Sequence, residues 1–96
     1  MITVTVSGNG VVMRGHAGYA DSGPDLVCCA ASVLAYTLAG ALKNLAGGAQ
    51  CRMEPGDACI TFAKTAKADL LVEAFLIGLL QLQAQYPDHV TVVDIR

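Results

Sequence analysis

Two long apolar runs, residues 26–45 and 67–86, dominate this sequence, and two short segments of a different pattern precede each of them. Both runs are rich in alanine and leucine and contain no proline, which is typical of helices. By contrast, residues 2–7 alternate strictly between apolar and hydroxyl side chains, which indicates a half-buried strand. A chain that alternates between these two periods is expected to pack helices against a sheet.

The turn residues predict two hairpins. Gly8, Asn9 and Gly10 offer the positive-φ residues of a tight turn, after which residues 11–15 form the returning strand. A second hairpin is expected within residues 50–62, around the two-residue turn Pro55-Gly56. In that register Cys51 shares the core face with Ile60 and Cys59 lies on the opposite face. We therefore expect no disulfide between these two cysteines.

The helices end at recognisable residues, and one more strand follows. Residues 46–49 place glycine where the first helix should stop, and Pro87 ends the second helix before a last strand at residues 89–95. The order is ββαββαβ. It predicts a single α+β domain over residues 1–96, with an antiparallel or mixed five-stranded sheet and two helices on one face. The first helix is apolar almost all round and is expected to be largely buried.

Composition narrows the class of partner. The chain has 96 residues, is 54% apolar and carries a formal net charge of −2, with no cluster of Lys or Arg. We therefore expect no direct nucleic-acid binding. The first ten residues lack the pattern of a signal peptide, and the apolar run at residues 70–82 is interrupted by Glu73. These features predict a cytoplasmic protein with reduced thiols and no membrane association.

Reactive side chains gather in residues 15–32, which hold one of the two histidines and two of the four cysteines. His16 ends a predicted strand. If Asp25 caps the first helix, Cys28 falls in its first turn, where the helix dipole stabilises a thiolate. A thiolate beside an imidazole is the minimum for nucleophilic catalysis by cysteine. Backbone N–H groups at the same helix start could serve as an oxyanion hole.

Other interpretations of these residues remain open at this point. A cysteine in an alanine-rich helix is usually a small core side chain, and a histidine at a strand end is usually a surface residue. His16, Cys28, Cys51 and Cys59 could also bind zinc, but no typical metal-ligand spacing is present. A redox or metal protein that uses the four thiols is a further alternative. We expect no metal and no cofactor.

The same stretch resembles the signature of the bacterial ribosomal-processing cysteine proteases, the Prp family. The resemblance rests on Gly15-His16-Ala17, then Gly23-Pro24-Asp25-Leu26-Val27-Cys28, and then Ala30 and Ser32. It continues to the end of the chain, where QYPDHVTVVDI is similar to the closing segment of the family. Cys29 departs from the pattern, because the family usually has alanine after the nucleophile.

This resemblance implies that Cys28 is the nucleophile and His16 the general base. Asp25 would either orient His16 or only cap the helix. The implied substrate is a short hydrophobic N-terminal extension of a large-subunit ribosomal protein, the twenty-seventh of its series, and the implied assembly is a homodimer. The alternative function is a non-enzymatic ribosome-associated binding module.

The loop of residues 17–24 lies between the two predicted catalytic residues. It has little to anchor it, so we expect it to be mobile without substrate, or to sit so that His16 and Cys28 are beyond hydrogen-bond reach. Tyr19 is a candidate contact for aromatic rings of the substrate. Gly18, Gly23 and Ser32 are further candidate substrate contacts.

Overall fold

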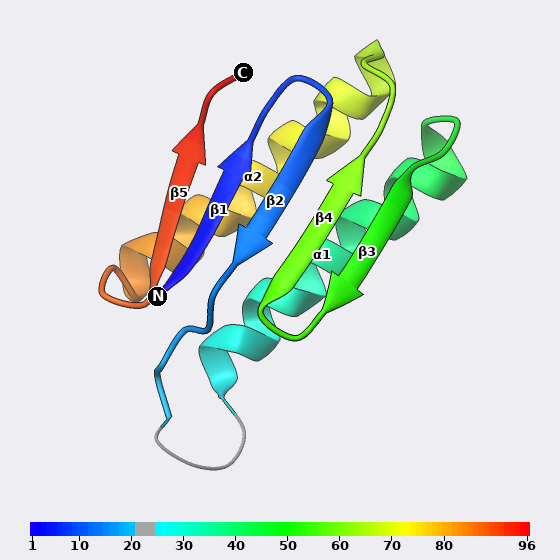
Figure 1. Cartoon of the computed structure of the whole chain (residues 1–96). Coiled ribbons are helices and arrows are strands. Elements are labelled where there is room, and N and C mark those ends of the chain that lie inside the picture. The colour runs from blue at the N-terminus through cyan, green and yellow to red at the C-terminus, as the bar shows by residue number, and fades with distance from the viewer. Residues whose placement is uncertain (21–24) are drawn as a thin grey trace.

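The predicted order of helices and strands is confirmed by the computed structural model, which describes residues 1–20 and 25–96. Figure 1 shows the elements in chain order. Most observed bounds lie within one residue of the expected ones. The elements are β1 (Ile2–Val6), β2 (Gly10–Arg14), α1 (Leu26–Leu45), β3 (Gln50–Glu54), β4 (Asp57–Thr61), α2 (Ala66–Gln85) and β5 (Val90–Asp94).

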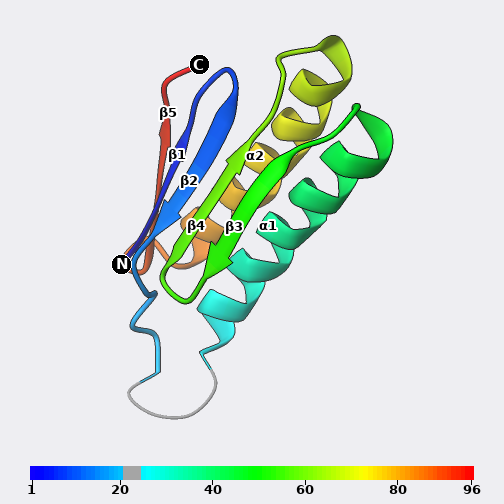
Figure 2. The ribbon, with the colours of Figure 1, turned by 45° about the vertical axis from the view of Figure 1, so that its right-hand side comes forward.

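The five strands form one mixed sheet in the order β3-β4-β2-β1-β5. β1 and β5 are parallel, while the other neighbouring strands are antiparallel. β1 and β5 are the first and last strands in the chain order, and their parallel pairing places Val90 at the start of β5 beside Ile2 at the start of β1. Both helices cover the same face of the sheet, with α1 under β3 and β4 and α2 under β1 and β5 (Figures 1 and 2).

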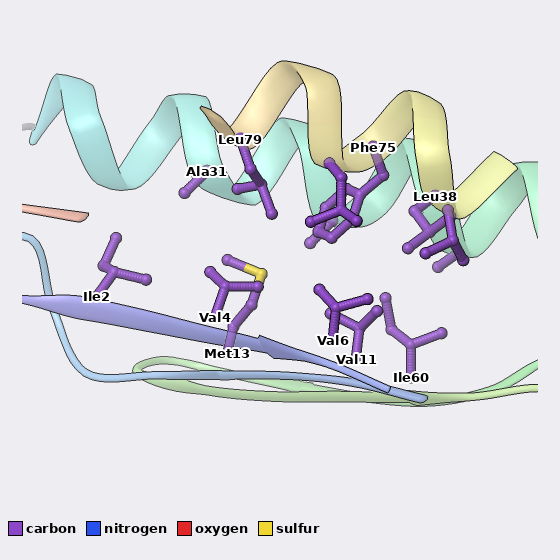
Figure 3. Close-up of a cluster of buried hydrophobic side chains, with 14 of the residues drawn as sticks. Ile2, Val4, Val6, Val11, Met13, Ala31, Leu38, Ile60, Phe75 and Leu79 are labelled. Carbon is purple, nitrogen blue, oxygen red and sulfur yellow. The ribbon is translucent and has the colours of Figure 1, made fainter. Parts of the chain in front are cut away.

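The hydrophobic core lies between the sheet and the two helices (Figure 3). Because side chains alternate across a strand, every second residue of β1 points into this layer, and the same holds for β2. The helices contribute one stripe each. The largest fully buried side chains are Val4, Val6, Val11, Val27, Leu42, Ile60, Val72, Leu79 and Val90.

The expectation that α1 is largely buried is wrong. Only one face of α1 meets the sheet and α2, because the fold has two layers and, among residues 1–20 and 25–96, no third layer covers the outer face of the helices. Leu26, Val33 and Tyr36 on the outer face are 58–62% exposed. Both helices are long and apolar enough to cross a membrane by length and composition alone. Core helices pass the same test, and each of these helices buries one stripe against the sheet.

The two hairpins differ in their turns. In the β3–β4 hairpin, Pro55-Gly56 forms the expected two-residue turn and Gly56 has φ +72°. Cys51 faces Ile60 and Arg52 faces Cys59, which confirms the predicted register, and all four cysteines are free. In the β1–β2 hairpin, neither Gly8 nor Gly10 has positive φ, so that expectation is wrong. The connection spans three residues, and Ser7 N–H closes it on the Gly10 carbonyl.

Candidate active site

Cys28 is the third residue of α1, as predicted, because Asp25 is the N-cap. The Asp25 carboxylate accepts hydrogen bonds from the backbone N–H groups of Val27 and Cys28 at 3.0 and 3.1 Å. It thereby satisfies two of the N–H groups that a helix start leaves without partners. Cys28 is half-buried, whereas Cys29 is exposed on a different side of the helix.

Asp25 also holds the segment that leads from β2. Its second carboxylate oxygen accepts a hydrogen bond from Tyr19 N–H at 3.1 Å. The hydrogen bond from Cys28 N–H makes the largest contribution to lowering the pKa of Asp25, and desolvation opposes it. Among the described residues, no hydrogen bond joins Asp25 to His16. The structure thus confirms the cap, and it links Asp25 to the loop backbone rather than to the imidazole.

His16 lies two residues after the end of β2 and against the turn between β3 and β4. A Cβ atom built on Gly56 would come within 2.6 Å of His16 Nε2, so the imidazole rests where only glycine leaves room. Gly15 N–H donates to the Gly56 carbonyl at 2.9 Å, which ties the end of β2 to the same turn. The position of His16 therefore depends on a turn that lies forty residues further along the chain.

His16 and Cys28 line one pocket of about 350 Å³. No hydrogen bond joins the two side chains among the described residues, as expected for the protein without substrate. Ser32, one turn after Cys28, also lines the pocket. Most of the remaining wall is apolar. It is formed by Ile2, Met13, Ala31, Ala35, Tyr36, Met53, Pro55 and Ala58, with Glu54 and Asp57 at the hairpin.

The backbone around Ala17 faces the thiol. Ala17 N–H donates to Cys28 Sγ at 3.2 Å, and the Met1 amino nitrogen donates to the carbonyl of His16 at 2.5 Å. Two of the expected oxyanion donors at the start of α1, the N–H groups of Val27 and Cys28, already bond to the Asp25 carboxylate. Within the described residues, Ala17 N–H is the backbone donor that forms a hydrogen bond with the sulfur.

The loop is anchored more firmly than expected over its first residues. Ala17 is buried, and its carbonyl lies 2.8 Å from His89 Nδ1. Tyr19 packs edge-on against Tyr86 and His89, with ring centroids 5.4 and 5.5 Å apart. The expectation that this loop has little to anchor it is thus wrong for Ala17 and Tyr19. Residues 21–24 lie outside the described residues.

The remaining predicted site residues divide as follows. Ser32 lies in the pocket wall, whereas Tyr19 and Gly18 are not part of it. Gly18 has φ +66° and open space around it. The prediction for Gly23 falls on a residue outside the described part of the chain.

Sequence reasoning missed most of the pocket wall. Ala31 and Ala35 follow Cys28 at helical spacings of three and seven residues, and these small side chains leave the hollow beside the thiol. That spacing was a usable signal. Nothing local pointed to Gly56 or His89, because both reach the site only through the tertiary fold.

The zinc alternative is not supported. Within residues 1–20 and 25–96, no three side chains of His, Cys, Asp or Glu are grouped so that they could hold a metal ion. Cys51 and Cys59 belong to opposite faces of the β3–β4 hairpin, so the two cannot both join one site with Cys28.

Comparison with solved structures gives close matches over nearly the whole chain. A ribosomal processing protease Prp from Staphylococcus aureus, in complex with a covalently linked product peptide, has a TM-score of 0.86 and 25% identity. That match covers 98% of this chain and 99% of the other. SMU.848 from Streptococcus mutans has a TM-score of 0.78 and 33% identity, covering 98% of this chain and 93% of the other.

A second S. aureus Prp structure, in complex with a substrate peptide, has a TM-score of 0.73 and 20% identity and covers 97% of this chain and 96% of the other, which supports the fold. No curated protein matches the chain. Residues 1–91 match the family model described as cysteine protease Prp. The matched residues include all of the residues that line the pocket, Cys28 and His16 among them. The chain therefore belongs to the Prp family of cysteine proteases.

Proposed function

We propose that this protein is a cysteine endopeptidase in which Cys28 is the nucleophile and His16 is the general acid and base. The observation that carries the proposal is the shared pocket. A thiol in the first turn of α1 and an imidazole from the segment that follows β2 line the same mostly apolar pocket. Membership of a cysteine protease family supports this choice over a non-enzymatic binding module.

The proposed chemistry has two halves. The Cys28 thiolate attacks the carbonyl carbon of the scissile bond, a C–S bond forms, and the carbonyl electron pair moves to oxygen. The His16 imidazolium then gives its proton to the amide nitrogen as the C–N bond breaks, leaving a thioester. In the second half, water gives a proton to His16 and attacks the thioester carbon. The C–S bond breaks and the thiolate is restored.

Ala17 N–H is the proposed donor to the oxyanion. It lies 3.2 Å from Cys28 Sγ, so it is close to any carbonyl carbon that the sulfur attacks. Fixed backbone donors that face developing negative charge are among the largest contributions to catalysis of acyl transfer. Because Cys28 N–H already bonds to Asp25, this role passes from the helix start to the loop.

The proposed substrate is an extended peptide with a large apolar side chain near the cut. The pocket beside Cys28 is lined by Met13, Met53 and Tyr36, and a methionine-rich wall adapts to the shape of an apolar group. The similar S. aureus protein is described as a ribosomal processing protease. We accordingly propose the hydrophobic N-terminal extension of the twenty-seventh large-subunit ribosomal protein as the substrate.

A homodimer in the cytoplasm is the proposed state of the protein. Apolar side chains lie exposed on the outer face of the helices, including Val33 and Tyr36 of α1 and Ile77 and Leu80 of α2. A second copy would remove this surface from water. Four free cysteines suit a reducing compartment. Sedimentation analysis tests the dimer, and a Val33→Glu variant should shift the protein to a monomer.

Cleavage of the ribosomal protein with and without its extension tests the function directly. Cys28→Ser should lower the rate by at least about a thousandfold, because a hydroxyl is a far weaker nucleophile than a thiolate. Cys29→Ser is the matched control and should retain most of the activity, since its side chain is exposed outside the pocket. Binding of the ribosomal protein without cleavage would favour the non-enzymatic module instead. Loss of activity in Cys29→Ser alone would contradict the assignment of the nucleophile.

A further inference from the structure

His89 occupies a fixed place between α2 and β5. Its backbone N–H donates to the Tyr86 carbonyl at 3.0 Å, and its carbonyl accepts from Ile2 N–H at 2.8 Å. The turn after α2 and the start of β1 thus hold the His89 backbone on both sides. From this position the imidazole reaches Ala17, which lies 72 residues earlier in the chain.

The contact between His89 and Ala17 defines the protonation of the ring. Nδ1 lies 2.8 Å from the Ala17 carbonyl oxygen. A carbonyl oxygen only accepts hydrogen bonds, so Nδ1 must carry the proton in the neutral as well as the charged imidazole. The ring also meets Tyr19 edge-on, with an interplanar angle of 85°. One side chain therefore contacts the loop at two residues.

Ala17 is bonded on both of its backbone groups. Its carbonyl is held by His89, and its N–H points at Cys28 Sγ. The residue is only 2% exposed, so it has little room to turn. His16 precedes it directly, and a rotation of Ala17 would move both the N–H that faces the sulfur and the imidazole.

We propose that His89 is a positioning residue for the active site, and this inference rests on the proposed function. Through its bond to the Ala17 carbonyl, His89 keeps the Ala17 N–H directed at Cys28 and keeps His16 at the pocket. The residues that it holds belong to neither a helix nor a strand, so no regular backbone hydrogen bonds replace this contact. Its loss should therefore affect the site more than the fold.

Three variants test this role. His89→Phe keeps an aromatic ring against Tyr19 but removes the donor. His89→Asn keeps a short side chain whose amide N–H can reach the same carbonyl. Asp88→Asn is the matched control, because Asp88 is the exposed neighbour in the same turn. Each is compared with the unaltered protein for kcat and KM on the extended ribosomal protein. Alkylation of Cys28 by iodoacetamide is followed in a Cys29→Ser background.

The expected result is a fall in kcat of roughly tenfold for His89→Phe, because small displacements of catalytic groups are costly. KM should stay nearly constant, the alkylation rate of Cys28 should fall in parallel, and His89→Asn should recover most of both rates. Nitrogen-15 spectra of the unaltered protein should show a protonated Nδ1 on His89 at high pH.

Two results would overturn the inference alone. The first is an unchanged kcat and an unchanged alkylation rate of Cys28 in His89→Phe. The second is an equal loss of kcat in His89→Phe and His89→Asn that is accompanied by an equal fall in melting temperature. A Cys28 that reacts no faster than Cys51 in the unaltered protein, without any cleavage, would overturn the proposed function and this inference with it.

Discussion

The two ends of the sheet both have a capped helix start and a glycine with positive φ, but these features have different roles at the two ends. At one end lie the start of α1, the β3–β4 turn and the start of β5, and this end carries the pocket (Figure 1). At the other end lie the end of α1 and the start of α2. Each end has a capped helix start and a positive-φ glycine. In the described part of the chain, only the cap and the turn at the pocket end also contact reactive side chains, namely Cys28 and His16. The functional role of a cap or a turn therefore depends on the residues that it contacts.

The largest difference between the two ends is expected when a glycine at each end is replaced by alanine. Gly56→Ala places a Cβ atom 2.6 Å from His16 Nε2, and the imidazole must swing away. We expect kcat to fall by roughly a hundredfold, because His16 leaves its place beside the pocket. Gly47 at the end of α1 has φ +89° and open space around it. Gly47→Ala should therefore cost only about 1–2 kcal/mol of unfolding free energy through backbone strain.

Cleavage assays and thermal unfolding on both glycine variants check this contrast. Equal activity in Gly56→Ala and the unaltered protein would mean that the imidazole does not act from its observed position. A loss of activity in a fully folded Gly47→Ala would show that the far end also contributes to the site.

The helix caps provide a second, smaller contrast. Thr65 caps α2 through a hydrogen bond from Ala68 N–H, and Thr65→Ala should lower the unfolding free energy by about 1 kcal/mol without changing kcat. Asp25→Ala should lower the unfolding free energy by a similar amount. It should also reduce kcat several-fold, because it frees Tyr19 and the start of the Cys28 helix. Kinetics on the two variants at equal folded fraction test this, and identical kcat values would remove the distinction.

The smallest effect should be a pH dependence of stability that belongs to the pocket end. The pKa of Asp25 is lowered in the folded protein, chiefly by the Cys28 N–H. The folded state thus binds a proton on Asp25 less readily than the unfolded state. The stabilisation is present above the ordinary carboxyl pKa and is lost as the pH falls through the lowered value. Asp25→Asn should flatten this part of an acid unfolding curve, and Thr65→Ala should leave the slope unchanged.

Much of the local structure was predictable because its causes are close together in the sequence. The cap at Asp25 and the place of Cys28 in the first turn depend on residues within one helical turn. The register of Cys51 and Cys59 follows from a two-residue turn between their strands. The β1–β2 turn was predicted less well. Its three-residue connection closes through Ser7, so the glycines need no positive φ there.

The pocket was only partly predictable. Cys28 and Ser32 share a helix face, so their common placement follows from their spacing. Met53 and Gly56 join them only because β4 pairs with β2, and this pairing places the β3–β4 turn against His16. No local pattern states which strand pairs with which.

The sequence by itself determined the order of elements, the core face of each strand and the helix turn that presents Cys28. These features depend on side-chain period and on neighbouring residues. The tertiary structure decided the rest. It exposed one face of α1, placed Gly56 under His16 and brought His89 to Ala17 across 72 residues. Such contacts arise from the packing of distant segments against one another, and no segment carries the information alone.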